Sequence, residues 1–221
     1  MMTQEISAKA AYQAWSASYD SDVNPTRDLD AVCLQRAPLE LDGARVLELG
    51  AGTGKNTAWL APRAAHVTAL DLSPAMLDQA RKHVPSGPVE FIEHDITAPW
   101  PVKTGEFDIV LANLVLEHIA DLAPILAEAW RVLKPGGALY ISELHPWRQW
   151  RGSRARFETA DGTRHIKAYL HSTADYLGTA LAAGFTLVAI EEPVEPGRET
   201  DTLPRLLTLL LRRHAAVTPP A

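Results

Sequence analysis

The sequence predicts an α/β fold of the Rossmann-like, doubly wound kind, and three observations lead to that prediction. The apolar run Val46–Leu49 is followed by alternating glycines at positions 50, 52 and 54, which is how a nucleotide-binding βαβ unit opens. A second apolar run ends in Asp71, 21 residues beyond Gly50, where such units place an acid. Further apolar runs alternate with helical segments, as a parallel sheet covered by helices requires.

Length and composition place the chain among ordinary globular proteins. Its 221 residues, 47% hydrophobic and 22% charged, suffice for one α/β domain. The formal net charge of −6 argues against a protein that coats nucleic acid, because phosphate binding requires a cationic face. Cys33 is the only cysteine, which excludes an internal disulfide and agrees with a reducing compartment. With no apparent signal peptide and no apolar run long enough to span a bilayer, we expect a cytoplasmic protein without a membrane partner.

The residues around the glycines indicate the charge of the ligand. Their spacing is G-x-G-x-G, whereas a dinucleotide site requires G-x-G-x-x-G. Glu48 stands two residues before the first glycine, where a carboxylate repels a pyrophosphate and attracts a cation. S-adenosyl-L-methionine fits, because it carries a sulfonium and an ammonium group and no phosphate. The alternative is a glycine-rich turn without a ligand.

This block resembles motif I of the class I S-adenosylmethionine-dependent methyltransferases, in particular their small-molecule, UbiE-like branch. The resemblance implies a mostly parallel, seven-stranded sheet of strand order 3-2-1-4-5-7-6 whose last strand is antiparallel. It also implies S-adenosyl-L-methionine as the cofactor. In the motif, the residues expected to bind it are Glu48, Gly50, Ala51, Gly52, Gly54 and Asn56.

Residues 3–20 are predicted to form a helix that ends near Tyr19. Tyr12, Trp15 and Tyr19 are spaced three and four residues apart and therefore share one helical face. This segment resembles the N-terminal stretch of small-molecule methyltransferases, in which the helix caps the cofactor and the second tyrosine reaches the methyl-transfer site. Tyr12 and Tyr19 are therefore expected to contact the cofactor, and Tyr19 to take part in catalysis. The alternative is that this face only packs on the domain.

The second strand and the helix after it extend the predicted site. Val67–Asp71 is the strand, and βαβ geometry directs Asp71 to the ribose hydroxyls of a bound nucleoside. Ser73 caps the following helix. Met76 in its first turn is expected beside the adenine, with Leu72 before it, although a core methionine is an equally good interpretation.

Two more strands end at the same edge of the sheet. After the third, Val89–Ile92, the resemblance places Asp95 at the adenine amino group and Ile96 beside it; Asp95 could also be only a loop residue. The fourth, Phe107–Asn113, is nearly all apolar, as a parallel strand covered on both faces should be. The stretch after it resembles motif IV, which lines the cleft between cofactor and acceptor. This places Asn113, Leu114 and His118 in the cofactor site.

An insertion after the fifth strand, residues 145–171, is predicted to be a lid. The strand itself is predicted over Ala138–Glu143, after a helix over Leu122–Leu133 and a turn at residues 134–137. His145 directly follows this strand, and its unperturbed pKa of about 6.5 makes it the candidate base. It could equally be a hydrogen-bonded loop residue that fixes the lid. The residues expected to bind the substrate are Trp147, Arg148, Trp150 and His171.

The lid is basic within an acidic protein. Its cationic residues are Arg148, Arg151, Arg154, Arg156, Arg164 and Lys167, against Glu158 and Asp161. Such residues can recognise a carboxylate or phosphate on the acceptor, or an acidic carrier protein. A solvated surface is the favoured interpretation, because no spacing among them selects a binding geometry.

The chain is predicted to be one domain over residues 1–221. A helix at Asp28–Ala37 completes an N-terminal cap over residues 1–38. No metal site is expected, because the eight histidines are scattered without an H-E-x-x-H pattern. The remaining predicted elements are a helix, Ser172–Ala183, and an antiparallel edge formed by the strands Phe185–Glu192 and Leu206–Arg212.

The leading hypothesis is methyl transfer from S-adenosyl-L-methionine to a small-molecule acceptor by in-line displacement. A cofactor-binding but inactive regulatory or partner subunit is the alternative. A nicotinamide-dependent oxidoreductase is opposed by the glycine spacing and by Glu48. A nucleic-acid methyltransferase is opposed by Asn113–Leu116, which lacks an N-P-P-[YF] tetrapeptide. A homodimer is left open.

Overall fold

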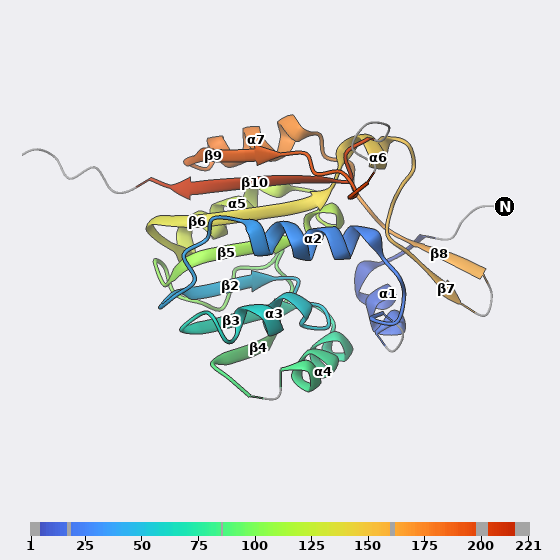
Figure 1. Cartoon of the computed structure of the whole chain (residues 1–221), viewed down its shortest axis with the longest axis horizontal. Coiled ribbons are helices and arrows are strands. Elements are labelled where there is room, and N and C mark those ends of the chain that lie inside the picture. Colours follow the sequence, from blue (N-terminus) through green and yellow to red (C-terminus); the bar gives the residue numbers. More distant parts are fainter. Residues whose placement is uncertain (1–4, 17–18, 85, 160–161, 198–202, 215–221) are drawn as a thin grey trace, which may run out of the picture.

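The computed structural model describes residues 5–16, 19–84, 86–159, 162–197 and 203–214, and its centre is a seven-stranded sheet (Figure 1). The strand order β4-β3-β2-β5-β6-β10-β9 becomes 3-2-1-4-5-7-6 when these strands are counted along the chain. β10 is antiparallel to both neighbours, and the other neighbouring pairs are parallel. The predicted fold class and strand order are therefore confirmed. The strands are β2 Arg45–Leu49, β3 His66–Asp71, β4 Val89–Glu93, β5 Phe107–Asn113, β6 Leu133–Leu144, β9 Phe185–Glu191 and β10 Leu206–Arg213.

Helices cover both faces of this sheet (Figure 1). On one face, Leu34 and Leu60 pack against the buried residues of the central strands. On the other face, Leu126 and Tyr176 join a larger buried cluster. Because both faces are covered, the central strands are mostly apolar, and their sequences do not alternate between apolar and polar residues. The helices are α2 Pro25–Arg36 and α3 Lys55–Leu60 on the first face, α5 Leu122–Val132 and α7 Thr173–Ala182 on the second, and α4 Pro74–His83 beside α3 and β4.

The cap and the lid meet beyond the carboxyl ends of the parallel strands, on the right of Figure 1. α1 (Ala8–Trp15) and α6 (Pro146–Trp150) lie there, with the hairpin of β7 (Arg156–Thr159) and β8 (Gly162–Ile166). β1 (Glu5–Ile6) pairs in parallel with β8, so segments far apart in the sequence form one three-stranded sheet. Local sequence patterns give no signal for such a long-range pairing.

Several predicted element boundaries are wrong. The described part of the predicted helix over residues 3–20 is only α1, which is capped by Ser7 and preceded by β1; residues 17 and 18 lie outside the described residues. α2 begins three residues before Asp28, because the Asn24 side chain accepts hydrogen bonds from its first amides. α3 ends at Leu60, and Pro62 has no amide hydrogen with which to continue its hydrogen bonds. β6 begins at Leu133 and includes the predicted turn.

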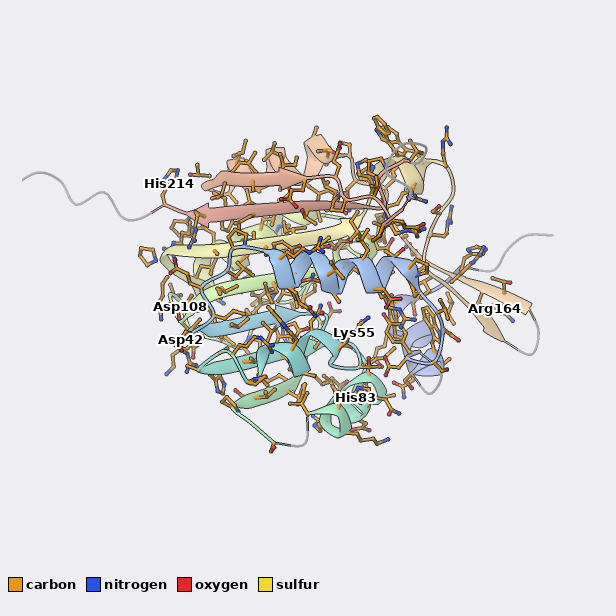
Figure 2. All side chains as sticks on the ribbon, viewed as in Figure 1. Asp42, Lys55, His83, Asp108, Arg164 and His214 are labelled. Carbon is orange, nitrogen blue, oxygen red and sulfur yellow. The ribbon has the colours of Figure 1, made fainter. Side chains whose placement is uncertain are left out.

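The functional edge of the sheet can be located from these elements. Figure 2 shows Asp42 and Asp108 at the end where the parallel strands begin, and Arg164 at the opposite end. Ligands of open α/β sheets bind at that opposite end, outside the carboxyl ends of the strands. Within the described ranges, no helix combines the length and the hydropathy needed to cross a membrane.

Candidate functional site

The glycine turn after β2 packs tightly on one side and opens on the other. Gly50, Gly52 and Gly54 have φ of 68°, 55° and 82°, which favours glycine at all three positions. A Cβ on Gly50 would lie 2.5 Å from Cγ2 of Val115, and one on Gly54 would lie 2.9 Å from Cβ of Ala80. A Cβ on Gly52 would meet nothing within 4 Å. The turn therefore approaches its neighbours closely at its ends and leaves space at its centre.

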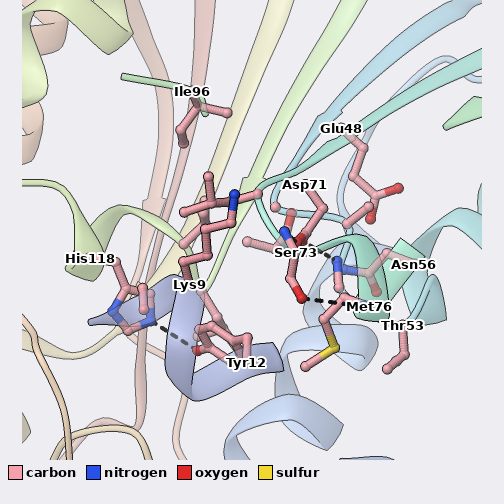
Figure 3. A pocket seen from close by; sticks show the side chains of 18 of the residues that line it. Lys9, Tyr12, Glu48, Thr53, Asn56, Asp71, Ser73, Met76, Ile96 and His118 are labelled. Carbon is pink, nitrogen blue, oxygen red and sulfur yellow. Dashed lines mark hydrogen bonds between the residues drawn. The ribbon is translucent and has the colours of Figure 1, made fainter. Parts of the chain in front are cut away.

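A cavity of about 250 Å³ lies at this turn, at the carboxyl ends of the parallel strands (Figure 3). Of the sixteen residues predicted to bind the cofactor, Gly54 does not line it, because that glycine faces α4. The structure therefore brings the other fifteen to one place from six separate segments. They are Tyr12, Tyr19, Glu48, Gly50, Ala51, Gly52, Asn56, Asp71, Leu72, Met76, Asp95, Ile96, Asn113, Leu114 and His118.

Carboxyl groups dominate the polar side of the cavity wall. Glu48 is 4% exposed, and its Oε2 accepts a hydrogen bond from Oγ1 of Thr57 at 2.6 Å. Burial raises the pKa of Glu48 to about 8, and the nearby Asp71 and Asp30 act in the same direction. Burial also raises the pKa of Asp30 and of Asp71. A ligand with a cationic end would favour the charged form of these acids and be held by it.

Asp71 fixes the glycine turn to the end of β3. Its Oδ2 accepts a hydrogen bond from the Gly52 amide at 2.7 Å, and its Oδ1 accepts one from the Ser73 amide at 2.8 Å. Asp95, past the end of β4, instead accepts hydrogen bonds from the hydroxyl and amide of Thr97, which lower its pKa. Each carboxylate is thus held in place by its own loop, and both line the same cavity.

Asn113 contributes an acceptor that has no partner. Its Nδ2 donates a hydrogen bond to Oδ1 of Asp30 at 2.7 Å. Its Oδ1 is buried, and within the described part of the chain it has no hydrogen-bond partner. Unpaired buried acceptors are unfavourable. A donor group on a ligand in the cavity would satisfy it, so this wall fits a ligand with an ammonium group.

Tyr12 and His118 connect the cap to the sheet across the cavity (Figure 3). The Tyr12 hydroxyl lies 2.9 Å from Nε2 of His118, and Nδ1 of His118 lies 3.0 Å from the carbonyl oxygen of Lys167. A carbonyl oxygen can only accept, so Nδ1 carries the proton and Nε2 accepts from Tyr12. The contact therefore links α1, the 3₁₀ helix η1 (Leu116–His118) and the segment after β8.

Tyr19 is held by Arg27. The guanidinium of Arg27 donates to the carbonyl oxygens of Tyr19 and Asp22 at 2.6 and 2.8 Å, and its carbon lies 4.0 Å from the centre of the Tyr19 ring. Burial raises the pKa of the Tyr19 phenol more than Arg27 lowers it. Tyr19 therefore keeps its proton near neutral pH and can act there as a hydrogen-bond donor.

A second cavity, of about 740 Å³, adjoins the first. Both are lined by Tyr12, Tyr19, Arg27 and Leu114. The second extends between the start of α2, the lid and the start of β10. Its charged lining residues, together with one histidine, are Arg27, Arg151, Arg154, Arg156, Arg205, Asp22, Glu117 and His165. Three of the lid arginines interpreted as solvated surface thus come together beside the first cavity.

His145 lies apart from both cavities. Its ring is 1% exposed: Nε2 donates to Oε1 of Glu192 at 3.1 Å, and Nδ1 accepts from the Trp147 amide at 3.2 Å, which caps α6. The strand end is at the expected edge of the sheet, but the ring turns toward the chain after β9. This geometry supports the alternative role, in which His145 fixes the lid, and gives it no access to an acceptor in either cavity.

The four residues expected to bind the substrate also lie outside both cavities. Trp147 and Trp150 are 52% and 58% exposed on α6. Arg148 donates to the carbonyl oxygens of Leu203 and Pro204, and His171 is buried with Nε2 2.7 Å from the carbonyl oxygen of Ile119. Arg148 therefore fastens the lid to the segment before β10, and His171 fastens the start of α7 to the segment before α5. Among the residues described, no three His, Cys, Asp or Glu side chains form a group that could hold a metal ion.

Comparison with known proteins agrees with this geometry. Residues 47–141 match the family model described as a methyltransferase domain. The chain is 35% identical over 167 residues to the biotin biosynthesis bifunctional protein BioHC of Cellvibrio japonicus, covering 72% of this chain and 31% of that protein. It is 37% identical over 142 residues to the ubiquinone biosynthesis O-methyltransferase of Xanthomonas oryzae pv. oryzae, covering 62% and 59%. The chain thus spans less than a third of the first relative's length and about three fifths of the second's.

A solved structure shows the same fold. It is described as a putative S-adenosylmethionine dependent methyltransferase from Listeria monocytogenes. The TM-score is 0.73 at 21% identity, and the superposition covers 85% of this chain and 99% of that one.

Proposed function

Because the chain belongs to the class I S-adenosylmethionine-dependent methyltransferases, we propose that it transfers the methyl group of S-adenosyl-L-methionine to a small-molecule acceptor. One observation carries this proposal: the first cavity collects the glycine turn, the buried acids Glu48 and Asp30, the half-buried Asp71 and an unpartnered Asn113 oxygen at the carboxyl edge of the sheet. The relatives support it, since one of them is named for O-methylation in ubiquinone biosynthesis.

The residues of the first cavity fit the parts of this cofactor. Glu48 and Asn113 would receive its ammonium group, because one is a buried acid and the other an orphaned acceptor. Asp71, at the end of β3, would take the ribose hydroxyls. Met76 and Ile96 would flank the adenine, with Asp95 at its edge. When bound, S-adenosyl-L-methionine supplies a methyl group on a positively charged sulfur, which needs no further activation.

The work left to the protein is positioning and the exclusion of water. Holding two reactants in line can lower a barrier by about 7–11 kcal/mol in favourable cases. α1 covers the cavity, and the chain of hydrogen bonds from Tyr12 through His118 to the Lys167 carbonyl holds it closed. The Tyr12 and Tyr19 side chains line both cavities, so they mark where acceptor and cofactor would meet.

Proton transfer has a smaller part in this mechanism. A base is required only if the accepting atom must lose a proton. His145 lines neither cavity, and burial raises the pKa of Tyr12 and of Tyr19. The Tyr12 hydroxyl already donates to His118, so Tyr19, with its ring under Arg27, is the phenol proposed to orient an acceptor as a hydrogen-bond donor.

Calorimetric titration tests the proposal directly. We expect S-adenosylmethionine and S-adenosylhomocysteine to bind at one site per chain and NADH not to bind. Incubation with methyl-labelled S-adenosylmethionine and a metabolite extract should then label a small molecule. Binding of NADH in place of S-adenosylmethionine would contradict the proposal. Cofactor binding with no labelled product in any extract would favour the inactive regulatory or partner subunit.

A further inference from the structure

The second cavity carries more positive charge than the rest of the molecule explains. The whole chain has a formal net charge of −6. Yet this cavity is lined by five arginines and only two carboxylates, Asp22 and Glu117. Both acids already accept hydrogen bonds: Asp22 from Nε1 of Trp15 at 2.7 Å, and Glu117 from Nε2 of Gln149 at 3.0 Å. We infer that the second cavity binds an anionic group of the methyl acceptor: a carboxylate, phosphate or phosphonate. This inference rests on the proposed function, because it assigns the substrate class of that same site.

The arginines reach the cavity from three separate parts of the chain. Arg27 lies in the first turn of α2, and Arg205 immediately precedes β10. The others, Arg151, Arg154 and Arg156, lie on the exposed rim between α6 and β7. A merely solvated face has no need to gather like charges from distant segments around a hollow, since like charges repel one another. An anion bound between the arginines would attract each of them and so offset their mutual repulsion.

Arg205 is held in place before any ligand arrives. Its side chain is 18% exposed, its Nη1 donates to Oγ1 of Thr26 at 3.0 Å, and its Nη2 forms an ion pair with Glu195. Burial and the neighbouring Arg148 lower its pKa. Its Nε is buried and has no hydrogen-bond partner within the described ranges. A cation fixed in this way loses little side-chain entropy on binding, and its unpartnered Nε is the group that would donate to a bound anion.

The start of α2 adds to the same field. Asn24, Pro25 and Thr26 line the second cavity, so the N-terminal end of this twelve-residue helix faces it. The macrodipole places partial positive charge at that end, which favours an anion. The Asn24 side chain already satisfies two of the first amides. The helix therefore contributes through its field, while the arginines supply the direct hydrogen bonds.

The position of the cavity makes the anion an anchor for the acceptor. Tyr12, Tyr19, Arg27 and Leu114 line both cavities, so a molecule in the second lies directly beside the first. An acceptor held by its anionic group in the wider cavity would direct its other end toward the cofactor. The binding energy of that remote group then positions the reacting atom, which is an efficient use of binding energy in catalysis.

Matched acceptors and variants test this assignment. Hydroxy and amino acids, their phosphonate analogues and the corresponding neutral amides would be assayed for labelled methyl transfer, with the acids also offered as thioesters of acyl carrier protein. We expect the acids to exceed the amides by about tenfold in kcat/KM, the effect of one charge-assisted hydrogen bond. Arg156→Gln should remove that preference. Arg164→Gln, on the same hairpin but outside the cavity lining (Figure 2), should preserve it.

A binding measurement separates this inference from the proposed function. Inorganic phosphate and malonate would be titrated calorimetrically into the protein with S-adenosylhomocysteine present. We expect Arg156→Gln to weaken their binding about tenfold and Arg164→Gln to leave it unchanged. Equal use of acids and amides, with phosphate binding unaffected by Arg156→Gln, would overturn the anionic acceptor while methyl transfer stands. Failure to bind S-adenosylmethionine at all would instead overturn the proposed function.

Discussion

The Tyr12 hydroxyl lies 2.9 Å from Nε2 of His118, and this hydrogen bond closes α1 over the first cavity. Tyr12→Phe removes the donor and keeps the ring, so packing with Trp15 and Tyr19 survives. A hydrogen bond of this kind is worth about 0.5–1.5 kcal/mol, so we expect a two- to twelvefold rise in the cofactor Kd. Calorimetric titration with S-adenosylhomocysteine measures it. Tyr169→Phe, outside both cavity linings, is the control; an equal effect there would contradict a closing role for Tyr12.

Cofactor affinity should depend on pH through Glu48. Its pKa is about 8 in the unliganded protein, so the carboxyl is largely protonated at pH 7. A bound ammonium group favours the carboxylate, and binding then releases a proton. We therefore expect affinity for S-adenosylmethionine to rise between pH 6 and 8 and then level off. Titrations in two buffers of different ionisation enthalpy count the protons released, and Glu48→Gln should reduce that number. An unchanged count in this variant would remove Glu48 from the linkage.

The same carboxyl should shape the pH dependence of stability. Its pKa is raised from 4.5 to about 8 by burial, so the folded state holds the proton more tightly than the unfolded chain. The resulting stability is fully present below pH 4.5 and is lost as the pH rises through 8. Glu48→Gln has no charge to bury. We expect the Tm of this variant, relative to that of the unsubstituted protein, to increase from pH 5 to pH 9. A difference in Tm that stays constant over this range would contradict the shifted pKa.

Asp71 should matter both for the turn and for the cofactor. Its two oxygens accept from the amides of Gly52 and Ser73. In Asp71→Asn one of these oxygens becomes an NH₂ group, which cannot accept, and a buried amide loses its partner. Loss of such a partner destabilises by about 1–3 kcal/mol. We also expect cofactor affinity to fall at least about tenfold, given the additional contact with ribose. Asp78→Asn, on the exposed side of α4, is the control and should leave cofactor affinity unchanged. An equal loss of cofactor affinity in the two variants would rule out the ribose contact.

The residues that the sequence placed at strand ends are brought by the structure to the lining of one cavity. Asp71, Asp95 and Asn113 follow apolar runs, and parallel strands bring their carboxyl ends to one edge. Asp30 lines the same cavity from the middle of α2 and was missed. The only local indication that Asp30 belongs to the site is that this acid shares a helix face with the buried Leu34.

The second cavity could not have been predicted from local patterns. Arg27, Arg156 and Arg205 lie far apart in the sequence, and long-range contacts such as the hydrogen bond from Arg205 to Thr26 and the pairing of β10 with β6 bring their segments together. His145 illustrates the converse. The sequence placed it correctly at the end of a strand, but side-chain direction depends on Glu192 and Trp147, which no spacing reveals.

Substitutions at two glycines of the turn should distinguish a role in packing from a role in cofactor binding. Gly54→Ala places a methyl group 2.9 Å from Cβ of Ala80 in a left-handed conformation. Gly52→Ala has the same conformational strain, about 1–2 kcal/mol, but meets nothing within 4 Å and projects where the first cavity is lined. We expect the first variant to lose more stability, by about a further 1–3 kcal/mol for overpacking.

The second variant should instead lose cofactor affinity, because its methyl group takes up space at the cavity wall. Urea unfolding and calorimetric titration on the same two proteins give both quantities. If Gly54→Ala retains its stability and loses affinity, then Gly54 contacts the ligand as the motif implied, and the close approach to α4 is not what selects glycine there. If instead Gly54→Ala loses stability and Gly52→Ala loses affinity, the glycines of the motif have two roles. Gly54 then fixes α3 against α4, and Gly52 leaves room for the cofactor.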